Sequence, residues 1–102
     1  MKSFGEYIRS QRVRRNLLLR EVAASLKIDP SLLSRIESNL KRPTRDQVIR
    51  LAGILKASES EMLIQYLSDR VVYELRDEGL SIQAMRVAEM KIRHLKKKAK
   101  ER

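Results

Sequence analysis

Residues 17–43, LLLREVAASLKIDPSLLSRIESNLKRP, decide the fold of this chain. They predict two short helices joined by a tight turn at Lys27 and Ile28. The carboxylate of Asp29 can accept the free amide hydrogens of the second helix, and Pro30 suits its first position, where no N–H is needed. Apolar residues at helical spacing are expected to fix the angle between the helices: Val22, Ala23, Leu26, Ile28, Leu33 and Ile36.

The outward side of the second helix is predicted to carry small polar groups and one guanidinium. Ser31, Ser34 and Arg35 lie there, together with Leu32 and Ser38. A short helix with such a face fits the major groove of DNA, where an arginine fork can engage O6 and N7 of a guanine. Ser31, Ser34 and Arg35 are therefore the candidate base contacts, the alternative being a solvated surface. Leu32 has two open roles, contact with a thymine methyl group or packing on a neighbouring helix or subunit.

The composition predicts an all-α protein with one modest core. The chain has 102 residues, with only three glycines, two prolines and no tryptophan. It has no cysteine, which excludes disulfides and thiolate metal sites and fits a reducing compartment. Phosphate-cradling glycine loops, nucleophile elbows and metal-ligand spacings are absent from the sequence, and His94 is a lone histidine among lysines. We therefore expect no catalysis, no metal and no cofactor.

The net charge of +10 predicts a polyanionic partner. Nucleic acid is favoured, with an anionic membrane or an acidic protein as alternatives. The charged first residues do not resemble a signal peptide, and we find no segment with the length needed to cross a bilayer. We expect a cytoplasmic protein without a membrane partner, associated with the nucleoid when bound to DNA.

Residues on both sides of the segment 17–43 also predict helices. Thr44 and Gln47 match a capping box, and Ser58 and Glu61 repeat it before another apolar run. The first helix is expected to direct Val13 into the core. The helices predicted from these signals cover 4–16, 19–26, 30–38, a segment after Thr44, a segment from about 59 to 77, and a last segment from Ser81.

The segment from Phe4 to about Met62 resembles the helix-turn-helix domain of phage repressors and their bacterial relatives, the XRE or Cro/C1-type family. The resemblance is carried by the string Leu33-Ser34-Arg35-Ile36-Glu37, the basic loop that ends at Pro43, Leu51-Ala52 and Leu55. It implies a five-helix lambda-repressor-like DNA-binding domain over 1–65. Residues 66–102 then form a C-terminal helical extension.

The resemblance also implies roles for single residues. Helix 30–38 would be the recognition helix, and Arg12 and Glu37 match a pair that forms a structural salt bridge in the family. The start of the second helix (18–20) and the loop after the recognition helix (39–42) match phosphate-contacting positions. With the cations beside the next helix start, the predicted phosphate contacts are Arg20, Asn39, Lys41, Arg42 and Arg45.

Three departures from the family pattern bear on these roles. Leu18 stands where a Ser or Thr cap is usual, so this helix end is expected to be weakly capped. Leu19 replaces a common glutamine and removes one polar contact to DNA. Lys27 and Asn39 replace turn glycines.

The C-terminal extension carries an apolar seam on a basic helix. Met85, Ala88, Ile92, Leu95 and Ala99 are spaced four and three residues apart in alternation. Three roles are open: dimerisation through Met85, Ala88, Ile92 and Leu95, a non-specific nucleic-acid arm, or a solvated end.

The sequence thus predicts a sequence-specific regulator of transcription that binds double-stranded DNA. We expect a repressor that acts as a homodimer on a palindromic operator, with helix 30–38 in the major groove of each half-site. The alternatives are an antitoxin whose extension covers a toxin partner, a controller of a restriction–modification operon, and a basic protein associated with RNA or a membrane.

Overall fold

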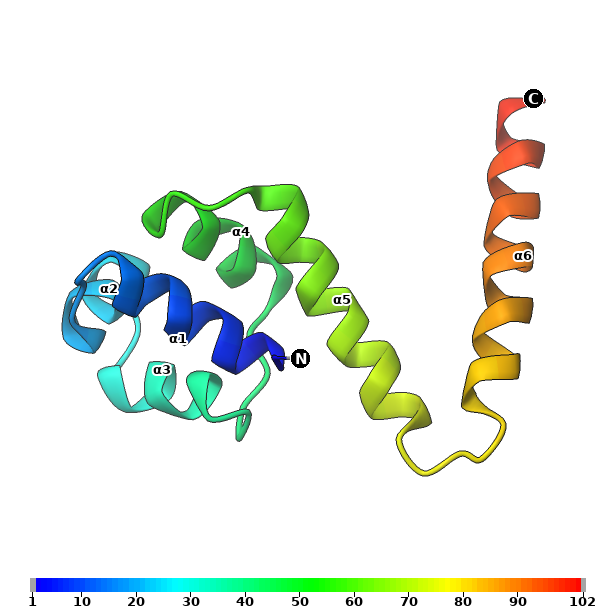
Figure 1. Cartoon of the computed structure of the whole chain (residues 1–102). Helices are drawn as coiled ribbons and strands as arrows, with labels where there is room; N and C mark the ends of the chain where they lie inside the picture. The colour runs from blue at the N-terminus through cyan, green and yellow to red at the C-terminus, as the bar shows by residue number, and fades with distance from the viewer. Residues whose placement is uncertain (1, 102) are drawn as a thin grey trace. The chain divides into compact units, whose positions relative to one another are not determined.

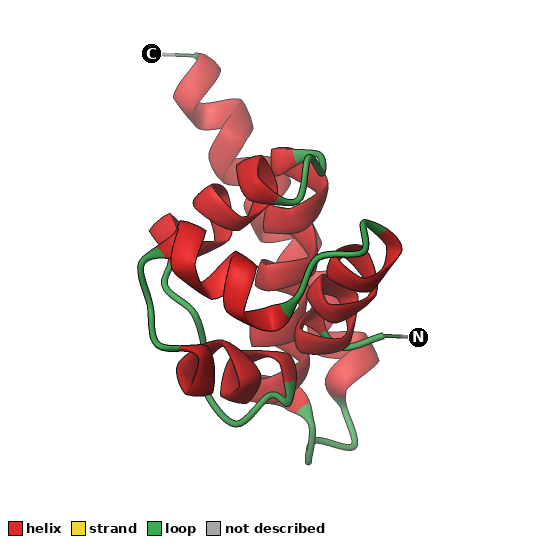
Figure 2. Cartoon of the chain, turned by 90° about the vertical axis from the view of Figure 1, so that its left-hand side faces the viewer, coloured by secondary structure: helices red, strands yellow, loops and turns green. Residues whose placement is uncertain are grey.

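The computed structural model describes residues 2–101 and contains helices but no strand in that range (Figures 1 and 2). The predicted all-α fold is therefore confirmed. The chain divides into two compact units, one up to Val71 and one from Val72. No helix within residues 2–101 has the combination of length and apolar content that a membrane span requires. The helices are α1 (Phe4–Arg14), α2 (Leu19–Leu26), α3 (Pro30–Glu37), α4 (Arg45–Ile54), α5 (Glu59–Leu75) and α6 (Ser81–Lys100).

The first unit is built around one apolar core. Helix α2 contacts both α3 and α4, and α1 contacts α3. All six apolar residues expected to fix the angle between α2 and α3 take part, five of them buried and Ile28 partly buried at the edge. The buried apolar residues are Phe4, Ile8, Val22, Ala23, Leu26, Leu33, Ile36, Val48, Leu51, Ala52, Leu55 and Met62.

Val13 does not join this core, contrary to the prediction. Its side chain is 55 % exposed, whereas Phe4 and Ile8 are buried. Phe4, Ile8 and Arg12 follow one another at intervals of four, so they share the inward face of α1. Arg12 therefore occupies the inward position in the last turn, and Val13, about a quarter-turn away, faces solvent.

The helix starts follow the predicted capping chemistry. Thr44 and Gln47 form the complete capping box of α4, with N–H···O distances of 3.1 and 2.9 Å. The Ser58 hydroxyl accepts the N–H of Glu61 at 3.2 Å. Helix α2 has no side-chain cap from Leu18, as expected, although the Glu21 carboxylate accepts the Leu18 N–H. These local bonds explain why the predicted helix starts agree with the structure.

Each of the first four helices is followed by a residue in the left-handed conformation, and none of these residues is glycine. They are Asn16, Lys27, Asn39 and Lys56, with φ between 51° and 63°. The next residue in each case donates its N–H back to the preceding helix, for example Leu40 to the Arg35 carbonyl at 2.8 Å. Lys27 and Asn39 thus take the conformation for which relatives use glycine.

Three side chains accept hydrogen bonds from the backbone N–H groups in the first turn of α1. Asp69 of α5 accepts the Phe4 N–H at 2.8 Å, Asn39 Oδ1 accepts the Gly5 N–H at 3.1 Å, and Ser3 Oγ accepts the Glu6 N–H at 3.3 Å. Two of these partners come from distant parts of the chain. The start of α1 is therefore fixed by the loop after α3 and by α5, in addition to its own N-cap.

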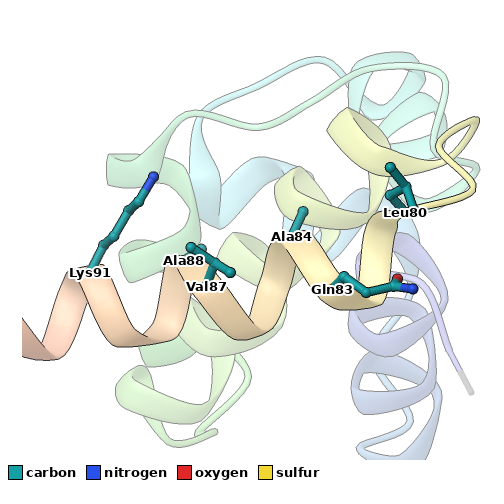
Figure 3. Close-up of a pocket in the computed structure, with 6 residues that line it drawn as sticks. All are labelled: Leu80, Gln83, Ala84, Val87, Ala88 and Lys91. Atoms are coloured by element: carbon teal, nitrogen blue, oxygen red, sulfur yellow. The ribbon is translucent and has the colours of Figure 1, made fainter.

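The second unit is dominated by α6, and none of the described side chains in α6 is buried. One side of the helix forms an open groove lined by Leu80, Gln83, Ala84, Val87, Ala88 and Lys91 (Figure 3). The larger seam residues are exposed, with 39 % for Met85, 52 % for Ile92 and 66 % for Leu95. In proteins most of the stability of a helix comes from packing of its apolar side, and none of the described residues of α6 is buried in this way.

Candidate nucleic-acid interface

Helix α3 presents Ser31, Ser34 and Arg35 to solvent, and all three side chains are exposed. The opposite side of the helix is anchored by Leu33 and Ile36, which are 0 % and 1 % exposed. The three predicted base contacts therefore share one exposed helix side with a buried anchor behind it. Leu32 is half-buried and packs against the core, which favours the second of its two predicted roles.

Ser31 is committed to the N-cap of α3. Its hydroxyl donates to Asp29 Oδ1 at 2.7 Å, and its backbone N–H donates to the same oxygen at 2.8 Å. Only the lone pairs of the Ser31 hydroxyl remain for a ligand, so it can accept from a base N–H but cannot donate while the cap persists. The side chains of Ser34 and Arg35 make no hydrogen bond within residues 2–101, so both can donate hydrogen bonds to a ligand.

The cap also makes the stability contributed at the start of α3 depend on pH. The hydrogen bonds from the Ser31 hydroxyl and backbone lower the pKa of Asp29 below its ordinary value of 3.8. Because the folded state lowers this pKa, the cap stabilises the fold above the ordinary value and is lost as the pH falls through the lowered one.

We therefore expect Asp29→Asn to change how the stability of the fold depends on pH under acidic conditions. Asparagine keeps an oxygen acceptor but does not titrate in this range. As the pH is lowered from 7 to 3, the melting temperature of the wild type should fall more than that of the variant. Circular dichroism measures both melting temperatures. An unchanged difference across that range would contradict the role given to the Asp29 carboxylate.

An ion pair joins α3 to α1. Arg12 Nε and Nη2 donate to the two carboxylate oxygens of Glu37 at 2.8 and 3.0 Å, and Arg12 Nη1 donates to the Leu17 carbonyl at 3.0 Å. The side chains are only 14 % and 7 % exposed. The hydrogen bonds to Glu37, together with its negative charge, raise the pKa of Arg12 above its already high ordinary value, so the guanidinium stays charged. The structure thus brings together the two residues that the family resemblance paired, at the end of α3.

Exposed cations flank α3 in the sequence on both sides. Arg20 lies in the first turn of α2, and Lys41, Arg42 and Arg45 lie in the loop and helix start after α3. Pro43 is buried and fixes this loop on the first unit. The free N–H groups at a helix start add to the positive potential, so the start of α4 with its cations suits a phosphate.

Asn39, the remaining predicted phosphate contact, has a different task in this structure. Its Oδ1 accepts from Gly5 N–H and its Nδ2 donates to Ser3 Oγ at 2.8 Å, while its backbone N–H donates to Ile36 O. The amide nitrogen of this exposed side chain has a second hydrogen, which can still be donated to a phosphate. The phosphate contacts therefore depend mainly on the four cations, and that of Asn39 stays a prediction that uses its second amide hydrogen.

Two residues that fix α1 against its neighbours were missed in the sequence. Gly5 lies so close to the end of α3 that a Cβ there would meet Glu37 O at 2.5 Å and Ile36 O at 2.6 Å. Asp69 caps α1 from 65 residues away. The absence of a side chain at position 5 was visible in the sequence, but its reason was not, because the contact is made with backbone atoms of a distant helix.

A helix α2 packed on the core, an exposed side of α3 and flanking cations are the arrangement expected of a helix-turn-helix domain. A family model described as a helix-turn-helix domain matches residues 3–63, more than half of the chain. The chain therefore belongs to the helix-turn-helix domain family, in the XRE (Cro/C1-like) group that the sequence resembles. No curated protein and no solved structure matches the chain.

Proposed function

We propose that this protein is a sequence-specific transcriptional repressor that binds double-stranded DNA as a homodimer. The observation that carries the proposal is the exposed side of α3, with Ser31, Ser34 and Arg35, on a helix held from behind by the core and by the Arg12–Glu37 pair. A rigidly held helix of this length can enter the major groove without losing much conformational freedom on binding. Covering a promoter in this way represses transcription.

The proposed contacts divide into two kinds. Arg35 donates two hydrogen bonds to one guanine, Ser34 donates to or accepts from a neighbouring base, and Ser31 accepts from a base amino group. Phosphates on either side are bound by Arg20, Lys41, Arg42 and Arg45, which fix the register and supply most of the affinity.

The homodimer follows from the exposed seam of the second unit. Met85, Ala88, Ile92 and Leu95 lie on one side of α6, where none of them is buried by residues 2–101: three are exposed and Ala88 is partly exposed. Pairing two copies through this seam would present two recognition helices to DNA. A dimer with two-fold symmetry requires an operator with the same symmetry, with half-site centres about 34 Å apart.

The test is a selection from random duplexes, with the mass of the protein in solution measured in parallel. We expect enrichment of a palindromic sequence, bound by a dimer, and an affinity that falls steeply with salt. Equal binding to all duplexes would contradict sequence-specific regulation and would favour a general nucleic-acid-binding role.

Arg35→Ala should weaken binding to the selected sequence by about 1–3 kcal/mol and relax one base position. Lys41→Ala is the matched control, because the loss of a phosphate contact weakens cognate and scrambled duplexes alike and lowers the salt slope by about one. Fluorescence anisotropy titrations at several salt concentrations measure both effects. Equal losses for Arg35→Ala on cognate and scrambled duplexes would assign this arginine to the backbone instead of a base.

A further inference from the structure

The seam of α6 has a property that bears on how two copies would pair. Ser81, one turn before Met85, extends the seam to six positions that differ in size along the helix: Ser81, Met85, Ala88, Ile92, Leu95 and Ala99. The small residues lie at both ends and at Ala88, and the large ones lie between them. Because side chains across a helix interface pack best when a small residue faces a large one, the order of sizes selects an orientation.

A parallel pair would place identical residues opposite each other. Ala88 would face Ala88, leaving a void between layers of methionine and isoleucine, and such a void costs stability. In an antiparallel pair with complete overlap, Ala88 faces Ile92 of the second copy and Met85 faces Leu95. Ser81 then faces Ala99 at both ends of the pair, and no layer between those ends consists of two small residues.

The charges along the second unit favour the same orientation. Residues 77–90 contain three acidic side chains and one arginine, whereas residues 91–101 contain six Lys or Arg and one Glu. A parallel pair brings the two cationic segments together, within the distance over which like charges repel at physiological salt. An antiparallel pair places each cationic segment beside the acidic segment of the other copy, near Asp77 and Glu78.

From the packing and the charge pattern we propose that α6 pairs with α6 of a second copy in an antiparallel orientation. This inference rests on the homodimer of the proposed function and specifies its interface. The seam of one copy is thus covered by the seam of the second copy, which runs in the opposite direction. The cationic last turns of α6 lie next to the turn that joins α5 and α6 in the other copy.

Disulfide trapping tests the orientation, and the absence of native cysteine makes the trapping specific. Ser81→Cys and Ala99→Cys variants of the full chain, one carrying a tag that changes its size, are unfolded in urea, refolded together and oxidised. Positions 81 and 99 are about 27 Å apart along the helix, so the two orientations cannot give the same product. The matched control pairs Gln83→Cys with Lys97→Cys, which lie on the side of α6 away from the seam.

We expect the mixed disulfide, which joins the Ser81→Cys variant to the Ala99→Cys variant, to dominate, well above its statistical share and above the control. Dominance of the two homodisulfides would mean a parallel pair and would overturn the orientation while leaving the dimer intact. Crosslinking no higher than the control would show that α6 does not pair with itself. Duplex binding by the same variants, measured separately, shows whether the DNA-binding proposal survives in either case.

Discussion

Arg12→Met is expected to lower the free energy of unfolding by about 3–5 kcal/mol. The variant leaves the Glu37 carboxylate, 7 % exposed in the native protein, without the two guanidinium bonds of 2.8 and 3.0 Å. A charge that stays buried without a partner costs more than the intact pair contributes. The Leu17 carbonyl also loses its donor. Urea unfolding followed by circular dichroism measures the change.

Two further variants separate charge from geometry. Arg12→Lys keeps the positive charge but not the planar fork, so its loss should be intermediate. The double variant Arg12→Met/Glu37→Leu removes both charges and should be more stable than Arg12→Met alone, which a double-mutant cycle will show as coupling between the sites. Independent, additive losses would contradict the proposed interdependence of the two side chains.

The parts of the fold that depend on neighbouring residues could be predicted from the sequence. Asp29, Pro30 and Thr44 act within four residues of their own position, and the structure places the helix starts where these residues predict them. The end of α5 was predicted at about Asp77, with Gly79 as the stop signal, and the helix ends at Leu75. Local chemistry thus gives helix starts more reliably than helix ends.

Contacts between distant residues could not be derived in this way. Nothing near Asp69 indicates that it caps α1, and the inward position of the charged Arg12 in place of Val13 depends on Glu37, 25 residues away. The candidate site likewise has features that the sequence predicts and features that depend on distant contacts. The exposed residues of α3 follow from helical spacing, but the commitment of the Ser31 hydroxyl and of the Asn39 amide depends on geometry that only the folded chain provides.

Gly5→Ala is expected to lower the free energy of unfolding by about 3 kcal/mol. The new Cβ would lie 2.5–2.7 Å from Glu37 O, Ile36 O and Asn39 Oδ1. Two of these atoms belong to the backbone at the end of α3 and cannot turn aside as a side chain would. Helix α1 must therefore move away from α3, which weakens the Gly5–Asn39 hydrogen bond and disturbs the Arg12–Glu37 pair.

Gly53→Ala is the matched control for this loss. Gly53 lies in α4, and a Cβ there would meet nothing within 4 Å. Because alanine favours the helix over glycine, this variant should gain about 0.5–1 kcal/mol. The same substitution is thus expected to have opposite signs at the two positions, read from urea unfolding of both variants. If Gly5→Ala were also stabilising, the close approach of α1 to α3 could not be what holds the recognition helix in place.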